Sequence, residues 1–220
     1  MNFRLLSAYK LLALATMVVS TVASGAASPA SAPVASKFAE VPASAELLAK
    51  VRAGGFVLYL RHGYTDNNRP DRVPDVDLND CSTQRPLTEE GRLLAKRVGE
   101  AISKAKLPIS EIRISPLCRS RESAAAAFPG KPVTIDKLLM YTANLTDVQK
   151  APIIANTRSL LSTPTAQGSN RLLVAHAPNL MDLIGYFPKE GTLVIFGPKG
   201  EAGFEYLGSV APARWSELLH

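Results

Sequence analysis

Three short hydrophobic segments are each followed by histidine, arginine or both. The first runs into Arg61 and His62, the second is followed by Arg119, and the third runs into His176. Guanidinium groups bind phosphate oxygens in pairs and neutralise their charge. A neutral imidazole is a nucleophile that can attack phosphorus, and nearby positive charge keeps it deprotonated. These residue types therefore favour phosphoryl transfer through a phosphorylated histidine.

The hydrophobic segments have the character of buried strands, at residues 56–60, 109–115 and 171–175. Helical periodicity follows the first two, at residues 88–105 and 117–128. This alternation predicts an α/β fold with three α/β/α layers and a mainly parallel central sheet. Ligands bind beyond the carboxyl ends of such strands. We therefore expect the two imidazoles and two guanidiniums to meet around one anion-sized site.

The remaining segments continue the pattern towards both ends of the domain. We expect further helices over residues 44–53, 147–161, 178–186 and 212–219, and short strands over residues 133–135, 192–196 and 203–209.

Composition excludes several classes of protein. The chain has 220 residues and is 46% hydrophobic, so it is not collagen-like, a coiled coil or wholly disordered. Its 25 Lys and Arg against 19 Asp and Glu are a mild, dispersed excess that does not predict a nucleic-acid partner. Two Cys and three His, without metal-ligand spacing, predict no metal site and no cofactor.

The N-terminus has the pattern of an export signal. Arg4 and Lys10 precede an apolar run at residues 11–19, and small residues follow. A retained membrane anchor is the alternative, but a bilayer span needs about 20 apolar residues. We expect a signal peptide at residues 1–27, whose cleavage leaves no membrane insertion and a periplasmic or secreted protein. An Ala/Ser/Pro-rich linker is predicted at 28–43 and the folded domain at 44–220.

Four motifs, in this order, resemble the histidine phosphatase superfamily, also called phosphoglycerate mutase-like. They are Arg61-His62-Gly63, LTEEGR from Leu87, SPLCRSRESA from Ser115, and VAHAP around His176. The resemblance covers residues 56–208. It implies the phosphoglycerate mutase-like fold.

The same resemblance implies roles for individual residues. His62 would be the nucleophile that becomes phosphorylated, and Arg61, Arg119 and His176 would complete the phosphate pocket. Thr65 and Asn68 would bind substrate from the loop after the nucleophile. Taken singly, the arginines are also compatible with surface ion pairs and His176 with a core histidine, but the four together favour a site.

The chain departs from the family where a proton donor is expected. Many relatives carry Glu in the stretch that here reads LLMY at residues 138–141, and others carry Asp after the second histidine, where this chain has Ala177. A leaving alkoxide needs a proton from a nearby group. Asp66 is the first candidate because it lies four residues after His62, although a turn residue fits it as well. The other candidates are Asp147, Asp182 and Glu190.

We expect an exported, metal-independent phosphohydrolase of the histidine acid phosphatase type. It would act on a small-molecule phosphate ester, such as a sugar phosphate, through a phosphohistidine on His62. The alternatives are a phosphohistidine phosphatase, a phosphomutase, or a phosphosugar-binding protein without activity. The sequence does not predict the oligomeric state.

The two cysteines are expected to pair. Cys81 lies in a long polar loop at residues 66–85, and Cys118 directly precedes Arg119. In an oxidising compartment a cysteine pair is usually bridged. A Cys81–Cys118 disulfide would hold the loop beside Arg119. A cysteine phosphatase is excluded because neither cysteine begins a Cys-x5-Arg cradle.

Overall fold

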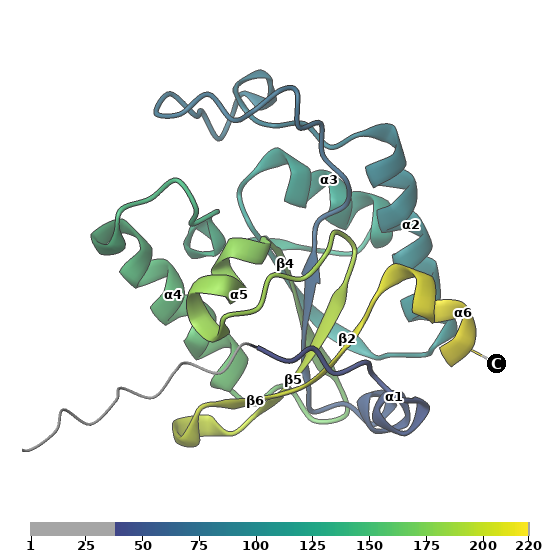
Figure 1. The fold of residues 1–220 in the computed structure, drawn as a ribbon. Helices are drawn as coiled ribbons and strands as arrows, with labels where there is room; N and C mark the ends of the chain where they lie inside the picture. Colours follow the sequence, from purple (N-terminus) through teal and green to yellow (C-terminus); the bar gives the residue numbers. More distant parts are fainter. Residues whose placement is uncertain (1–37, 220) are drawn as a thin grey trace, which may run out of the picture. The chain divides into compact units, whose positions relative to one another are not determined.

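A computed structural model describes residues 38–219 of the chain. The predicted signal peptide and residues 28–37 of the predicted linker lie outside the described residues. Six strands form one sheet, with helices on both of its faces (Figure 1). The strands are β1 (Val57–Arg61), β2 (Ile109–Ile114), β3 (Thr134–Ile135), β4 (Asn170–Ala175), β5 (Leu193–Pro198) and β6 (Phe204–Val210).

The sheet has the order β3-β2-β4-β1-β5-β6 and is mostly parallel, as predicted. Strands β1 to β4 run in the same direction, whereas β5 is antiparallel to both β1 and β6. The reversal follows from the short helix α5 (Ala177–Ile184), which is followed by β5 starting opposite Leu60, near the carboxyl end of β1. A strand that begins at that end must run back across the sheet.

Alternating side chains of each strand face two hydrophobic cores. In β1, Leu58 and Leu60 pack into one core, while Val57 and Tyr59 pack into the other. The first core is shared with α1 (Ala45–Arg52), α2 (Glu89–Lys104), α3 (Cys118–Ala127) and α6 (Trp215–Leu218). The second core is shared with α4 (Asp147–Ser162) and α5. Helices thus cover both faces, which confirms the three-layer prediction (Figure 1).

Two glycines let the start of α2 pack directly on the chain that follows β1. A Cβ on Gly63 would lie 2.2 Å from the carbonyl oxygen of Gly91, and a Cβ on Gly91 would lie 2.2 Å from that of Tyr64. Thr88 begins the helix, and its hydroxyl accepts a hydrogen bond from the Gly91 amide at 3.0 Å. This close contact fixes the position of the backbone next to His62.

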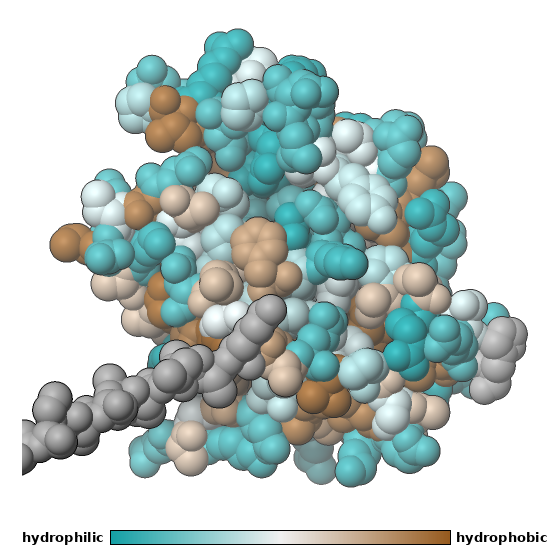
Figure 2. All heavy atoms as spheres, viewed as in Figure 1, coloured by the Kyte–Doolittle hydropathy of each residue, from teal (hydrophilic) through white to brown (hydrophobic). Residues whose placement is uncertain are grey.

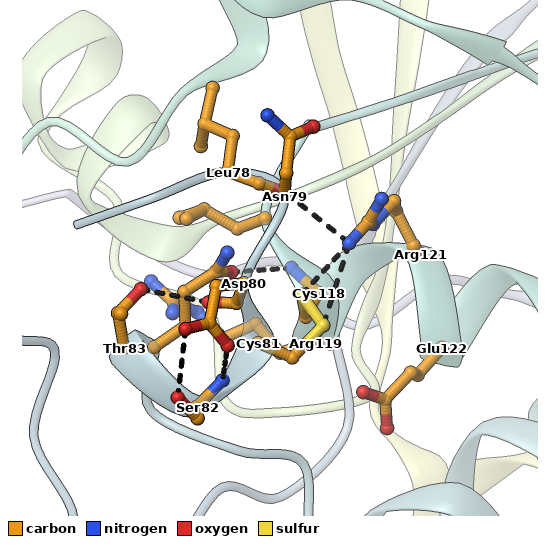
Figure 3. The surroundings of a disulfide bond; sticks show 12 residues. Leu78, Asn79, Asp80, Cys81, Ser82, Thr83, Cys118, Arg119, Arg121 and Glu122 are labelled. Atoms are coloured by element: carbon orange, nitrogen blue, oxygen red, sulfur yellow. Dashed lines mark hydrogen bonds between the residues drawn. A yellow bond between two sulfur atoms is a disulfide. The ribbon is translucent and has the colours of Figure 1, made fainter.

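The loop between β1 and α2 is long and irregular, and it lies at the top of the view in Figure 1. Its surface is mostly hydrophilic (Figure 2). The predicted Cys81–Cys118 disulfide is confirmed, with 5.8 Å between the Cα atoms, and it ties this loop to the start of α3 (Figure 3). The buried side chain of Gln84 adds a second tie, because its Oε1 accepts a hydrogen bond from the Cys118 amide at 2.7 Å.

The domain begins before residue 44. Phe38 stacks on Tyr186 with 4.4 Å between ring centroids, and Pro42 pairs with Ser209 of β6. Residues 38–43, predicted as linker, therefore pack against the sheet edge because Phe38 and Ala43 have apolar surface to bury. Within residues 38–219, no helix has the length and hydropathy to cross a membrane.

The short 3-10 turns complete the list of elements: η1 (Cys81–Thr83), η2 (Lys137–Leu139), η3 (Gly200–Ala202) and η4 (Pro212–Arg214). The C-terminal segment 212–219, predicted as one helix, thus consists of a 3-10 turn followed by the short α6.

Candidate active site

The four predicted side chains meet at the carboxyl ends of neighbouring strands. Arg61 is the last residue of β1 and His62 follows it, while His176 follows β4, which pairs with β1 in parallel. Arg119 is in the first turn of α3, which follows β2 on the other side of β4. The rings of His62 and His176 have their centroids 5.2 Å apart. The parallel sheet thus brings together residues that are more than a hundred positions apart in sequence.

His62 is held with one ring nitrogen free for chemistry. Its Nδ1 lies 2.8 Å from the carbonyl oxygen of Gly63. Because a carbonyl only accepts hydrogen bonds, Nδ1 carries the proton and the lone pair is on Nε2. The Gly63 amide donates to Ser123 Oγ at 3.0 Å, and that hydroxyl donates to the Arg119 carbonyl oxygen at 2.7 Å. These hydrogen bonds connect the backbone next to His62 to α3 and so fix its position.

His176 is fixed through its backbone and its ring. The Tyr59 hydroxyl accepts from the His176 amide at 3.1 Å and donates to the His176 carbonyl oxygen at 2.8 Å. The His176 Nε2 is 2.7 Å from Ser115 Oγ, at the end of β2. When that hydroxyl donates to Nε2, the ring proton lies on Nδ1, and Nδ1 can then donate a hydrogen bond to an oxyanion.

Burial and positive charge keep both imidazoles neutral. Burial lowers the pKa of His62 well below its ordinary value, and the Arg119 guanidinium lowers this pKa further. Burial also lowers the pKa of His176 well below its ordinary value, again with Arg119 as the next cause. Arg61 and Arg85 act on both rings in the same direction. A neutral His62 is the form that can act as a nucleophile.

The two predicted arginines have different partners. Arg61 donates from Nη1 to the Pro188 carbonyl oxygen and from Nη2 to Glu190 Oε1, both at 2.6 Å. Arg119 is fully buried and faces the ring of Tyr141, 5.1 Å from its centroid. Its Nη1 and Nη2 donate to Asp71, a carboxylate of the loop.

Several buried N–H donors in the site have no partner among the described residues. They are the Nε atoms of Arg61, Arg85 and Arg119. The Nδ1 atom of His176 is a fourth buried nitrogen without a partner in this part of the chain. Unpaired buried donors are costly, so such a group indicates a ligand that accepts hydrogen bonds. A tetrahedral oxyanion fits this requirement. Within residues 38–219, no three His, Cys, Asp or Glu side chains are grouped to hold a metal ion.

The structure places the predicted substrate-binding residues at the base of the loop. Thr65 forms a β-bridge with Leu87, and Asn68 is exposed. Asp66 Oδ1 accepts a hydrogen bond from the Asn68 amide at 2.9 Å, so its carboxylate stabilises a turn. None of these three side chains bonds to the histidines or arginines of the site in the described chain. Their assignments stay predictions.

The other predicted proton donors are paired with a cation or exposed. Glu190 forms the ion pair with Arg61, and Asp182 pairs with Lys150 at 3.2 Å. Asp147 is exposed in the first turn of α4. None of the three is bonded to His62 or His176 in the described residues.

Sequence reasoning missed three residues of the site, namely Asp71, Arg85 and Tyr141. Tyr141 stands in the LLMY stretch that lacks the family carboxylate, and its ring centroid is 5.5 Å from that of His176. Arg85 lies two residues before the LTEEGR motif. Asp71 and Arg85 lie in the loop that contains Cys81. The predicted Cys81–Cys118 disulfide places this loop beside Arg119, and this was the one signal in the sequence that residues of the loop could enter the site.

Comparison with known proteins finds a family model and solved structures to which the chain is similar. Residues 57–142 match the family model described as histidine phosphatase superfamily (branch 1). No curated protein matches the chain. A similar solved structure is that of the protein histidine phosphatase SixA complexed with tungstate, which is 15% identical, covers 72% of this chain and 98% of its own, and has a TM-score of 0.50.

Two mycobacterial structures are similar to the same extent. The open reading frame Rv3214 from Mycobacterium tuberculosis is 16% identical, with coverage of 72% and 99% and a TM-score of 0.52. The structure named mycobacterial hydrolase 1 is 18% identical, with coverage of 71% and 99% and a TM-score of 0.50. At these identities the similarity shows the fold.

Proposed function

We propose that this chain, which belongs to the histidine phosphatase superfamily, is a phosphohydrolase that acts on phosphomonoesters through a phosphohistidine on His62. One observation carries the proposal. A neutral histidine with a free Nε2 lies 5.2 Å, ring to ring, from a second neutral histidine, beside buried guanidinium donors that have no partner within residues 38–219. That arrangement combines a nucleophile with a binding site for an oxyanion.

The residues would divide the reaction between them. The Nε2 of His62 attacks phosphorus, while Arg61, Arg119 and His176 bind the phosphoryl oxygens and stabilise their charge. Water then attacks the phosphohistidine and releases inorganic phosphate, which makes the enzyme a hydrolase of the histidine acid phosphatase type. Substrates would be small phosphate esters, with sugar phosphates as the first class to test.

Phosphate release from a substrate panel tests this function. The panel contains sugar phosphates, aryl and alkyl phosphates and a phosphohistidine protein, assayed with a metal chelator present. We expect turnover of at least one ester by the wild type and a loss of at least about a thousandfold in His62→Ala. Arg119→Ala should lose activity strongly, whereas Arg97→Ala, an exposed arginine of α2, should not. Equal activity of wild type and His62→Ala would contradict the proposal.

We also propose that the protein is exported. The support is the N-terminal pattern of residues 1–27 and the disulfide, since structural disulfides are rare in the cytosol. Fractionation of producing cells, followed by N-terminal sequencing, should find a chain in the periplasm or medium that begins near residue 28. An uncleaved chain in the cytosol would contradict this assignment.

A further inference from the structure

Asp71, in the loop between β1 and α2, forms an ion pair with Arg119, whose guanidinium is expected to bind phosphate. Asp71 Oδ1 is 2.9 Å from Arg119 Nη1, and Oδ2 is 3.3 Å from Nη2. The Arg119 side chain has no exposed surface, and that of Asp71 is 9% exposed. The backbone amide of Arg85 also donates to Asp71 Oδ1 at 2.8 Å. A phosphate group binds the same fork of an arginine, so Asp71 lies at the edge of the phosphoryl site.

Asp71 also lines a small cavity. Its volume is about 160 Å³, and Asp71 and Tyr141 are among its lining residues. Apolar side chains form most of its wall, including Val73, Val76, Leu117, Met140 and Leu145. An apolar cavity of this size holds a ring such as benzene. Asp71 thus borders both the arginine fork and a space suited to the organic part of a phosphate ester.

We propose that Asp71 is the proton donor to the leaving group, which occupies this cavity and belongs to the ester of a small apolar or aromatic alcohol. The inference rests on the proposed function. With the phosphoryl group on Arg119 and the organic group in the cavity, the ester oxygen that joins them lies next to Asp71. Asp71 also supplies what the LLMY stretch lacks, namely a carboxyl group at the site.

Substrate binding would prepare Asp71 for this role. In the substrate-free structure the Asp71 side chain is held by the Arg119 fork. A phosphate that takes over this fork releases the Asp71 side chain from Arg119 and leaves it beside the ester oxygen. The role assigned to Asp71 requires that it carries a proton when the ester bond breaks, because a leaving alkoxide needs one.

The reaction balances with His62, Asp71 and water. The Nε2 lone pair of His62 forms the N–P bond as the P–O ester bond breaks, and the electron pair of that bond stays on the ester oxygen. This oxygen takes the Asp71 proton and leaves as the alcohol. In the second step Asp71 accepts a proton from water, whose oxygen attacks phosphorus. The N–P pair returns to Nε2, and hydrogen phosphate leaves.

A matched pair of substrates tests the assignment. Nitrophenyl phosphate and benzyl phosphate have leaving groups of similar size, but only the alkoxide from benzyl phosphate needs a proton as it leaves. Proton donation contributes about 100-fold or more. We therefore expect Asp71→Asn to lower kcat/KM for benzyl phosphate by about 100-fold or more, and that for nitrophenyl phosphate by about fivefold at most. Asp75→Asn, an exposed residue of the same loop, is the control and should change neither.

Other outcomes overturn the assignment. An equal loss on both substrates means that Asp71 acts only on folding or binding, and no loss on either means that it has no role. Tyr141 borders the same two regions, so Tyr141→Phe is assayed in parallel. A loss confined to benzyl phosphate in that variant, and not in Asp71→Asn, assigns proton donation to the tyrosine.

The failure of this inference can be told from failure of the proposed function. If the wild type hydrolyses neither substrate and forms no phosphohistidine, the proposed function is wrong and Asp71 has no reaction to serve. If the wild type hydrolyses both substrates through His62 while Asp71→Asn shows no dependence on the leaving group, only the role of Asp71 is wrong.

Discussion

Replacing both cysteines by serine should lower the free energy of unfolding by about 4 kcal/mol. The Cys81–Cys118 bond closes a loop with a sequence separation of 37 residues. In the chain-entropy relation a loop of this length restricts the unfolded chain by roughly 13 cal/mol/K, which is about 4 kcal/mol at room temperature. The unfolded fraction should therefore rise by roughly a thousandfold under native conditions.

Equilibrium unfolding in guanidinium chloride measures this difference directly. The wild type is compared with the Cys81→Ser, Cys118→Ser double variant, each with and without reductant. Reductant should lower the unfolding midpoint of the wild type and leave that of the double variant unchanged. A difference below about 1 kcal/mol between the two oxidised proteins would refute the loop-closure reasoning.

The same double variant should also bind phosphate esters less tightly. The disulfide and the Gln84 hydrogen bond hold the loop at Cys118, next to Arg119. Without the disulfide, Asp71 and Arg85 lose a restraint on their position. We expect KM for phosphate esters to rise several-fold at a temperature where the variant remains folded, because ordering the loop then has to occur on binding.

Three further perturbations have definite expected results. The pKa of His62 and of His176 is lowered on folding, so below about pH 6.5 the unfolded chain takes up protons that the folded chain does not. The free energy of unfolding should therefore fall with decreasing pH by up to about 1.4 kcal/mol per pH unit for each ring. Urea unfolding between pH 7 and 5 should show that this free energy depends less steeply on pH in His176→Gln than in the wild type. An unchanged pH dependence would argue against a lowered pKa of His176. Gly63→Ala places a Cβ 2.2 Å from the Gly91 carbonyl oxygen, so it should cost about 2 kcal/mol or more in thermal unfolding and reduce kcat. Gly130→Ala is the control for kcat, because its Cβ meets no atom of the described residues within 4 Å; its φ of +74° should cost about 1–2 kcal/mol of stability and leave kcat unchanged. Tyr59→Phe removes both hydrogen bonds to the His176 backbone and should lower the free energy of unfolding by about 1–3 kcal/mol. A variant that unfolds at the same midpoint as the wild type would contradict this expectation.

The sequence predicted the strands and the residues at their ends because both depend on local patterns. Continuous apolar runs mark β1, β2 and β4, and parallel pairing then requires their carboxyl ends to meet. The convergence of His62 and His176 follows from that topology alone. The disulfide was predictable because only two cysteines had to pair.

The rest depends on tertiary contacts that have no local pattern. Asp71 reaches Arg119 only because the loop folds back over the sheet end, and nothing in its neighbouring residues distinguishes it from Asp66 or Asp75. The direction of β5 depends on where α5 ends relative to the sheet. The packing of Phe38 on Tyr186 joins residues that are far apart in the sequence, so a composition-based boundary at residue 44 placed Phe38 in the linker.

The covalent intermediate on His62 is the most direct test of the proposed chemistry. The protein is mixed with a ³²P-labelled substrate, quenched within milliseconds, digested and sequenced to locate the label. We expect label that is stable in base and lost in acid, located on the peptide that contains His62, and absent from His62→Ala. Label on another residue, or turnover without a labelled enzyme under these conditions, would contradict the assignment of His62 as the nucleophile.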